Sequence, residues 1–378
     1  MSVHLLLLIL VGAASAVLTG QVRRYALRAG LCDQPGARRS HARVTPRGGG
    51  LAIALTSLPA FAWLAFEGVL APADALALGG AGALTAAIGF VDDHRPVAAR
   101  WRLSVHLLAA CWALYWIGRS ARPAGAADRL AGMLPSWIGE LPAAWLPAPF
   151  SAHFPMLVPS SGAAAAVLPI VLLTVLVVLG IVWLLNLCNF MDGIDTIATL
   201  QAIVICVAGA GLYVITGHAS LALGPLVLAA ACAGFLYWNL PPARIFLGDA
   251  GSGFLGIVIG VLALQAGRVD VALPAAWIVL CGAFLMDASV TLLGRILRGQ
   301  RVWLAHREHA YQHLARRCGR HLPVSIGFAL VTMLWSAPLA ALVALHRIAP
   351  ATGILVGCVP LAVVALALGA GRPEVASR

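Results

Sequence analysis

Long apolar stretches recur along almost the whole chain, and they constrain its fold more than any other feature. A helix needs about 20 mostly apolar residues to cross a bilayer. Hydrophobic residues make up 61% of the chain and charged residues only 10%, whereas soluble domains carry about 25% charged residues. Eleven segments qualify as candidate spans: 2–22, 47–66, 74–91, 102–118, 166–186, 197–216, 220–239, 251–267, 272–293, 324–345 and 351–370. We therefore predict an all-α, polytopic membrane helix bundle of about eleven transmembrane helices that forms a single domain over residues 1–378.

The arginines predict how this bundle is oriented. Twenty of the 25 basic residues, all of them arginine, fall on one side of the predicted bundle, in 23–47, 92–102, 240–250, 294–323 and the C-terminal tail. The positive-inside rule makes that side cytoplasmic. Arg23 and Arg24 follow the first apolar stretch and no basic residue precedes it, which is the reverse of a signal peptide. We expect an uncleaved anchor with the N-terminus outside and a long external loop over 119–165.

Several function classes are excluded by composition. The chain contains no lysine, so it has no Schiff-base lysine and no Walker lysine. The formal net charge of +11 could suggest nucleic acid, but the one-sided arginine placement favours membrane topology instead, and no nucleic-acid partner is expected. The eight cysteines form no C-x-x-C pair and are interpreted as small apolar fillers.

Acidic residues gather at the predicted cytoplasmic helix ends. An ionisable group at membrane depth costs at least about 2.5–3.5 kcal/mol, so it usually has a functional reason. Six of the 14 acidic residues lie at or near these ends: Asp92, Asp93, Asp192, Asp195, Asp249 and Asp287. Four separate regions supply them to one face, as a divalent cation and a phosphate would require.

The first two motifs are rich in carboxylates and amides. Asp92 and Asp93 end an apolar stretch and are interpreted as a metal-neutralised or base pair, or alternatively as solvated residues or a helix cap. The second motif places two amides three residues apart before two carboxylates three residues apart: Asn186, Asn189, Asp192, Gly193 and Asp195. A helix cap would explain one of these aspartates but not the whole set.

The third and fourth motifs suit phosphate. Small residues from Gly248 to Gly253 open a helix around Asp249, and free N–H groups at such an end bind phosphate well, although glycines also serve close packing. His306–His313 lies in an arginine-rich loop that suits a diphosphate, with anionic lipid as the alternative partner and zinc as a weaker one. Asp287 with Arg295 and Arg298 would form an Asp–Arg pair that orients this loop.

Together and in this order, the four motifs resemble the polyprenyl-phosphate N-acetylhexosamine 1-phosphate transferases of glycosyltransferase family 4. The resemblance covers about residues 30–325, including a first loop over Asp33–Gly50. It implies a multi-pass enzyme of the bacterial inner membrane with a cytoplasmic active site and Mg²⁺ as cofactor, Mn²⁺ being an alternative. The implied partners are a UDP-N-acetylaminosugar, polyprenyl phosphate, membrane lipid and, in a homodimer, a second copy of the chain.

The resemblance also implies individual roles. Asp92 and Asp93 would activate the lipid phosphate, Asp249 would bind the metal with Asn189, and His309 would stabilise charge. The remaining residues would bind substrate, with Asp195 and Phe246 beside the uracil: Asn186, Asn189, Asp192, Gly193, Asp195, Phe246 and Arg102.

Three positions depart from the family pattern. Thr196 replaces a glycine, Pro96 stands where the pentapeptide translocase has lysine, and a His-x-His-His run reads His309-Ala-Tyr311-Gln312. The last two favour the branch that initiates O-antigen or other surface polysaccharides, and Tyr311 and Gln312 are candidate sugar contacts.

Alternatives remain open at this point. A transporter for nucleotide sugars or divalent cations is the rival, although transporter sites usually lie near the bilayer midplane. A scaffold without activity is a third interpretation. The sequence is also compatible with both direct transfer and a two-step route through an aspartyl-phosphate.

Overall fold

The computed structural model describes residues 3–34, 43–120, 163–301 and 306–373, so most of the expected external loop 119–165 lies outside the described residues. The helices of its first half are α1 (Val3–Arg28), α2 (Leu51–Phe66), α3 (Pro72–His94), α4 (Ala99–Ser120), α8 (Ala163–Met191) and α9 (Ile197–Ile215). Those of its second half are α10 (Leu223–Asn239), α11 (Gly248–Ala266), α12 (Leu273–Leu280), α13 (Gly282–Leu297), α14 (Ala310–Cys318), α15 (Leu322–Val331), α16 (Ala337–Ala344) and α17 (Pro350–Leu368). A 3-10 turn, Ala219–Ala222, precedes α10, and a π-helical segment, Thr332–Ser336, joins α15 to α16.

The predicted all-α membrane fold is confirmed. The described residues contain eight helices long and apolar enough to cross a membrane, or up to nine if the bent pair α12 and α13 counts as one span. The expected count of eleven stays a prediction, because α2 is only 16 residues long and α4 carries Arg100, Arg102 and Arg119, which lower its hydropathy.

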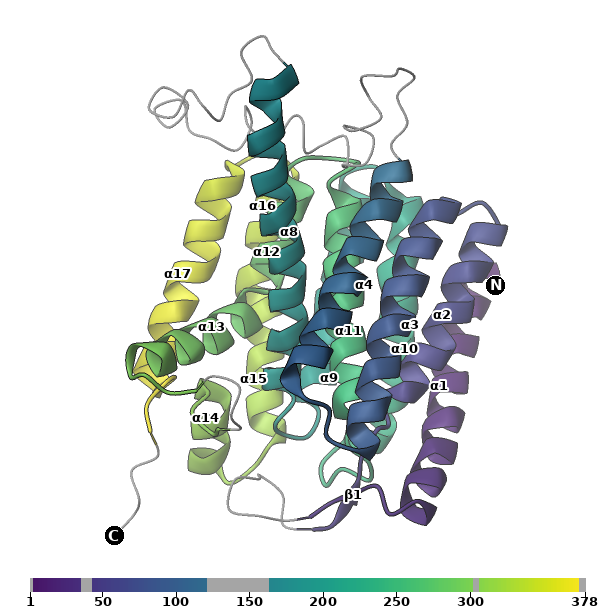
Figure 1. Ribbon diagram of the computed structural model, residues 1–378, viewed down its shortest axis with the longest axis vertical. Coiled ribbons are helices and arrows are strands. Elements are labelled where there is room, and N and C mark those ends of the chain that lie inside the picture. The colour runs from purple at the N-terminus through teal and green to yellow at the C-terminus, as the bar shows by residue number, and fades with distance from the viewer. Residues whose placement is uncertain (1–2, 35–42, 121–162, 302–305, 374–378) are drawn as a thin grey trace.

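The expected span 272–293 is not one straight helix. Helices α12 and α13 meet at an angle of 68°, and α13 lies across the bundle in Figure 1. Asp287, Thr291 and Arg295 recur every four residues on α13, and all three are buried. A polar face of this kind needs polar partners rather than lipid, and the loop before α14 supplies them.

Helix α11 forms the centre of the bundle, and nearly all its residues are buried. Small residues let its first turn approach two other segments closely. A Cβ at Gly89 of α3 would lie 2.4 Å from the carbonyl oxygen of Asp249, and one at Gly50 would lie 2.2 Å from the Cα of Gly251. Any larger side chain would push these backbones apart, so the glycines fix the start of α11 against α3 and α2.

The connecting segments that carry the polar motifs gather at one end of the bundle, the lower end in Figure 1. The two-residue strands β1 (Cys32–Asp33) and β2 (Thr45–Pro46) pair antiparallel there, with Cys32 opposite Pro46. Helix α14 and the C-terminal end of α17 lie at the same end.

Candidate active site

A polar cavity of about 400 Å³ opens at this end. Its lining contains seven of the site residues expected from the sequence: Asp93, Asn189, Asp192, Gly193, Asp195, Phe246 and Asp249. The other lining residues are Asp33, Arg47, Ile194, Asn239, Leu247, Gly248, Ser252, Gln312 and His321. Hydrogen-bond acceptors and donors from eight separate places in the chain thus surround a space that suits a polar, charged ligand.

A larger and mainly apolar groove of about 1040 Å³ lies beside this cavity. Its walls come from α3, α4, α8, α11, α13 and the loop before α14, and they include the expected residues Arg102, Asn186 and His309. Leu103, Leu176, Leu179, Trp183 and Leu292 supply much of the apolar lining. Asn189 and Asp249 line both spaces, so the cavity and the groove meet at these two residues.

Asn189, near the end of α8, and Asp249, in the first turn of α11, are joined directly. The Asn189 Nδ2 donates to Asp249 Oδ1 over 2.7 Å. The expectation that Asp249 opens a helix is confirmed, since α11 begins at Gly248. The hydrogen bond fixes the carboxylate at the junction.

Asp93 lines the cavity and also binds the first turn of α11. Its two carboxylate oxygens accept the backbone N–H groups of Asp249 and Ala250, over 3.1 and 3.2 Å. These donors belong to the first turn of α11, where free N–H groups favour an anion. The alternative interpretation of a helix cap therefore holds for Asp93, although the helix it caps is α11 rather than the next helix in the chain.

Asp92 is paired rather than open to either space. Its Oδ1 accepts the N–H of Val97 over 2.5 Å, and its Oδ2 accepts from Arg102 Nη1 over 2.7 Å. The same Arg102 nitrogen lies 4.0 Å from Asp249 Oδ2. Asp92 thus holds the Arg102 guanidinium at the mouth of the groove, beside the junction.

Asp192 shows the strongest electrostatic perturbation outside the helices. Burial, together with the neighbouring carboxylates of Asp249, Asp93 and Asp195, raises its pKa to about 8. Each of these causes disfavours the charged form. The cavity therefore gathers carboxyl groups that disfavour one another's ionisation, and a bound cation would relieve this repulsion.

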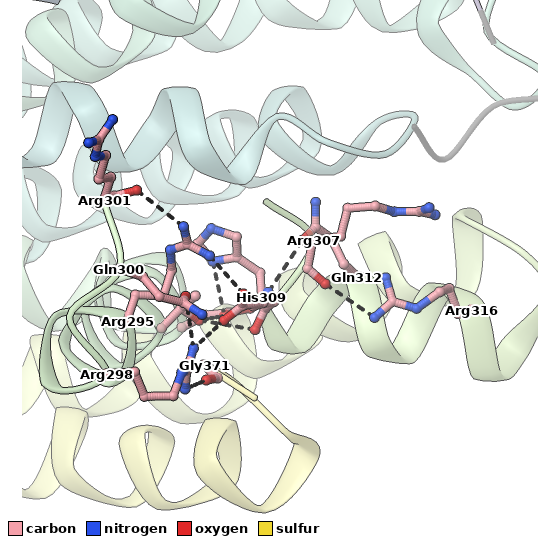
Figure 2. Close-up of polar contacts among 12 residues, drawn as sticks. Arg295, Arg298, Gln300, Arg301, Arg307, His309, Gln312, Arg316 and Gly371 are labelled. Atoms are coloured by element: carbon pink, nitrogen blue, oxygen red, sulfur yellow. Dashed lines mark hydrogen bonds and ion pairs between the residues drawn. The ribbon is translucent and has the colours of Figure 1, made fainter. Parts of the chain in front are cut away.

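The loop before α14 is anchored in a different way from the one expected. Arg295 and Arg298 pair with Glu308, not with Asp287: Arg295 Nη1 lies 2.7 Å from Glu308 Oε1, and Arg298 Nη2 contacts Oε2. Figure 2 shows Arg298 also reaching Gly371, whose carbonyl oxygen accepts from Nη1. Since Glu308 presents two oxygens toward two arginines, the expected Asp–Arg pair was wrong.

Asp287 instead caps α14. Its Oδ1 and Oδ2 accept the N–H groups of Ala310 and Tyr311 over 2.8 and 3.0 Å. His309 lies beside it, with Nδ1 3.4 Å from Oδ1, and its ring is buried against Phe190. His309 contributes to the groove wall and not to the lining of the polar cavity.

Tyr311 and Gln312, which depart from the family's His-x-His-His run, have different roles. Tyr311 is fully buried, its hydroxyl donates to the Phe190 carbonyl over 2.9 Å, and burial raises its pKa. It is absent from the cavity lining, so the expectation that Tyr311 contacts a sugar was wrong. Gln312 does line the cavity, and its Oε1 accepts from the N–H of His309 over 3.3 Å.

The backbone conformation of Thr196 explains why the family has a glycine at this position. Its φ is +69°, a left-handed conformation that is rare for a β-branched residue. Two hydrogen bonds hold it there, from its N–H to Asn239 Oδ1 over 2.8 Å and from its hydroxyl to the Asp195 carbonyl over 2.5 Å.

The sequence analysis assigned no individual role to several lining residues, although it singled out the first loop and the Gly248–Gly253 motif; they include Asp33, Arg47, Asn239, Ser252 and His321. Arg47 donates from Nη2 to the Asp93 carbonyl over 2.6 Å. Its place beside three glycines was a usable signal, whereas His321 lies in a segment with no local motif. Among the described residues, no group of three His, Cys, Asp or Glu side chains is arranged to enclose a metal ion.

Comparison with known proteins agrees with this arrangement. The model of glycosyl transferase family 4 matches residues 75–267, which include both aspartate pairs and the start of α11. A decaprenyl-phosphate N-acetylglucosaminephosphotransferase of Mycolicibacterium smegmatis is 28% identical over 322 residues, or 77% of this chain and 70% of the relative. A probable undecaprenyl-phosphate N-acetylglucosaminyl 1-phosphate transferase of Bacillus subtilis is 26% identical, with 79% and 73% covered.

A shorter match is to a relative with a different name. A phospho-N-acetylmuramoyl-pentapeptide-transferase of Moorella thermoacetica is 39% identical over 77 residues, 20% of this chain and 23% of the relative. The fold and the joined cavities define a polytopic membrane protein with a polar site at one end of its bundle. The chain belongs to glycosyl transferase family 4, the family of polyprenyl-phosphate sugar-phosphate transferases.

Proposed function

We propose that this protein transfers a sugar 1-phosphate from a UDP-N-acetylaminosugar to polyprenyl phosphate, which releases UMP and leaves a polyprenyl-diphosphate-sugar in the membrane. The observation that carries the proposal is the junction at Asn189 and Asp249, where a polar cavity meets an apolar groove. A water-soluble donor and a lipid acceptor need two such spaces with one common point. The two relatives are named as transferases of N-acetylglucosamine phosphate and of decaprenyl or undecaprenyl phosphate, which supports a polyprenyl phosphate acceptor and an N-acetylaminosugar.

The groove suits the acceptor lipid. Seven of its 21 lining residues are leucine, isoleucine or valine, and α4 contributes Arg100 and Arg102 to the same lining. A guanidinium binds phosphate through paired donors, so Arg102 is the residue that we assign to the lipid phosphate. Asn186 contributes to the same wall, with its Nδ2 bound to the Val182 carbonyl over 2.7 Å.

The cavity suits a divalent cation and a diphosphate, with Mg²⁺ as the proposed ion and Mn²⁺ as an alternative. Asp249 and Asp192, with the amide oxygen of Asn189, would hold the ion. They are oxygen ligands, which Mg²⁺ prefers, and Mg²⁺ usually takes one or two carboxylates and completes its shell with water and substrate phosphate. Such a site needs no cage of three protein ligands. When bound, the cation offsets charge on the diphosphate.

We propose direct transfer in one step. The lipid phosphate is already an anion near neutral pH, so its oxygen needs no general base to attack the phosphorus that carries the sugar. The new P–O bond forms as the bond to the bridging oxygen breaks, and UMP leaves with that oxygen. Arg102, held by Asp92, orients the attacking phosphate, whereas Asp92 has both oxygens engaged and is a poor nucleophile.

We further propose that the cavity faces the cytoplasm of a bacterium, with the chain in the inner membrane and its N-terminus outside. The one-sided arginines support this orientation. Gln312 in place of the family histidine supports the branch that initiates O-antigen or other surface polysaccharides.

The decisive experiment is UMP release by purified protein in detergent or nanodiscs. UMP should form from a UDP-N-acetylaminosugar only when both polyprenyl phosphate and Mg²⁺ are added. Release of UMP in one burst before lipid is added would instead support an aspartyl-phosphate route, and no release under any condition would refute the proposed reaction.

A further inference from the structure

His321 lines the polar cavity, although no motif marks it and the proposed reaction assigns it no role. It immediately precedes α15, and its Nδ1 lies 3.3 Å from the Oδ2 of Asp195 and 3.3 Å from the Asp195 backbone nitrogen. A single imidazole therefore contacts both the side chain and the main chain of one aspartate.

Asp195 is held by further contacts from the same helix and from the loop after α10. Ser325, one turn after His321, donates from its hydroxyl to the Asp195 carbonyl over 2.9 Å. The N–H of Ala243 donates to Oδ2 over 3.2 Å. Within the described residues, Oδ1 accepts no protein hydrogen bond, so one oxygen of a fixed carboxylate is left for a ligand.

The lining of the cavity divides into two kinds of chemistry. Asp192, Asp249 and Asn189 suit a cation and a diphosphate. Phe246 and Asp195, which line the same cavity, instead offer an aromatic face and a hydrogen-bond acceptor. A flat nucleobase needs this combination: a face to stack on and a partner for its edge.

A carboxylate discriminates between pyrimidines. Uracil presents an N3–H donor at its edge, whereas the N3 of cytosine is an acceptor and would leave the carboxylate oxygen opposed by a lone pair. An unpaired buried polar group is costly, and sites built around such a bond reject the analogue that lacks it by large factors. The discrimination is lost if the carboxylate can rotate away.

We propose that His321 is a positioning residue that fixes Asp195 so that its free oxygen accepts the N3–H of uracil, and that this pair gives the enzyme its preference for uridine over cytidine nucleotides. The inference rests on the proposed function. His321 acts through Asp195 and takes no part in the transfer of phosphate. Its removal should therefore weaken nucleotide binding and leave the chemical step largely intact.

The test compares His321→Ala, His321→Asn and His321→Gln in the full-length protein in nanodiscs. Binding of UMP and CMP is measured by calorimetry, and KM and kcat are measured with UDP-N-acetylglucosamine. His321→Ala should raise the KM about tenfold, which corresponds to about 1.4 kcal/mol, change kcat less than twofold and reduce the UMP-over-CMP preference. His321→Asn, whose amide can occupy the Nδ1 position, should restore the preference, whereas His321→Gln, whose amide reaches the Nε2 position, should not.

The chain offers a matched control at the opposite end of the bundle. His346 Nε2 lies 2.7 Å from Asp270 Oδ2, in the turn after α11, so His346→Ala also removes a His–Asp pair and should leave both constants unchanged. An unchanged KM and preference in His321→Ala, or a loss confined to kcat, overturns the inference. If the wild-type protein neither binds UMP nor releases it from UDP-sugars, the proposed function itself fails.

Discussion

The Nδ2 of Asn189 lies 2.7 Å from the Oδ1 of Asp249, and these two residues form the boundary between the polar cavity and the apolar groove. The first ends a long apolar helix, and the second begins the most buried helix of the bundle. A donor in the cavity and a lipid in the groove can therefore both reach Asp249. The first prediction follows from this position.

Asp249→Asn should abolish transfer while the protein still inserts and folds. The substitution keeps the size of the side chain but removes the charge, and charge stabilisation by a metal supplies several kcal/mol, so the loss should reach several orders of magnitude. UMP release is measured at saturating Mg²⁺, with Asp270→Asn at the far end as the control for removal of an acidic group. Turnover near the wild-type level would refute the assignment of Asp249.

Arg102→Ala should impair use of the lipid more than use of the nucleotide sugar. Arg102 lines the groove but not the cavity, so the KM for polyprenyl phosphate should rise about tenfold or more, as expected for a lost charge-assisted hydrogen bond of about 1.5–3 kcal/mol. The KM for the UDP-sugar should change little. Arg119→Ala, at the other end of α4, is the matched control. A rise confined to the UDP-sugar KM would place the lipid phosphate elsewhere.

The sequence predicted the class of fold and four of the acidic residues that line the cavity, Asp93, Asp192, Asp195 and Asp249, because both depend on patterns local in the chain. The length of an apolar stretch alone identifies a membrane helix. Neighbouring residues of the motif around Asn189 and Asp192 line the cavity together. Which partner each carboxylate binds could not be predicted in this way. Asp92 and Asp93 are adjacent in sequence, yet one pairs with Arg102 and the other caps α11, a helix more than 150 residues away.

Tertiary contact also explains the wrong Asp–Arg pair and the histidine that was overlooked. Glu308 takes the arginines expected for Asp287 because the bend between α12 and α13 brings both Arg295 and Arg298 against the loop before α14. His321 escaped notice because its partner, Asp195, is 126 residues away in the chain.

Binding of a divalent cation should strengthen as pH rises toward 9. The pKa of Asp192 is raised to about 8, so below pH 8 the carboxyl mostly carries a proton that the cation must displace. The apparent Kd should therefore rise about tenfold for each pH unit below 8. Mn²⁺ binding to the protein without nucleotide is measured by electron paramagnetic resonance between pH 6 and 9. Asp192→Asn should make the profile less steep, and a wild-type Kd that is constant over this range would contradict the prediction.

The orientation in the membrane can be read from two exposed positions. Cys318 is exposed in the arginine-rich segment at the active-site end, and Glu67 is exposed in the turn between α2 and α3, at the opposite end. An impermeant thiol reagent on intact cells should label Glu67→Cys, and it should leave Cys318 unlabelled until the cells are opened, each site being tested in a variant without other cysteines. Labelling of Cys318 in intact cells would reverse the proposed orientation.

The last prediction concerns the sugar. We expect the protein to accept a small UDP-N-acetylaminosugar and to reject the UDP-muramoyl-pentapeptide, because contacts to the base and the diphosphate are common to all these donors and discrimination must come from groups beside the sugar. Gln312 is such a group: it lines the cavity, and its Oε1 is fixed by the N–H of His309.

The test compares turnover of UDP-N-acetylglucosamine, its 6-deoxy relatives and the pentapeptide donor. Gln312→Ala should change the ranking of the small donors, since a polar partner of the preferred sugar would be lost. Tyr311→Phe is the matched control. Its hydroxyl is buried and bound to the Phe190 carbonyl, so its loss should lower stability by about 1 kcal/mol and leave the ranking of donors unchanged. If the pentapeptide donor proves the best substrate of the wild-type protein, both the branch assignment and the role of Gln312 are wrong.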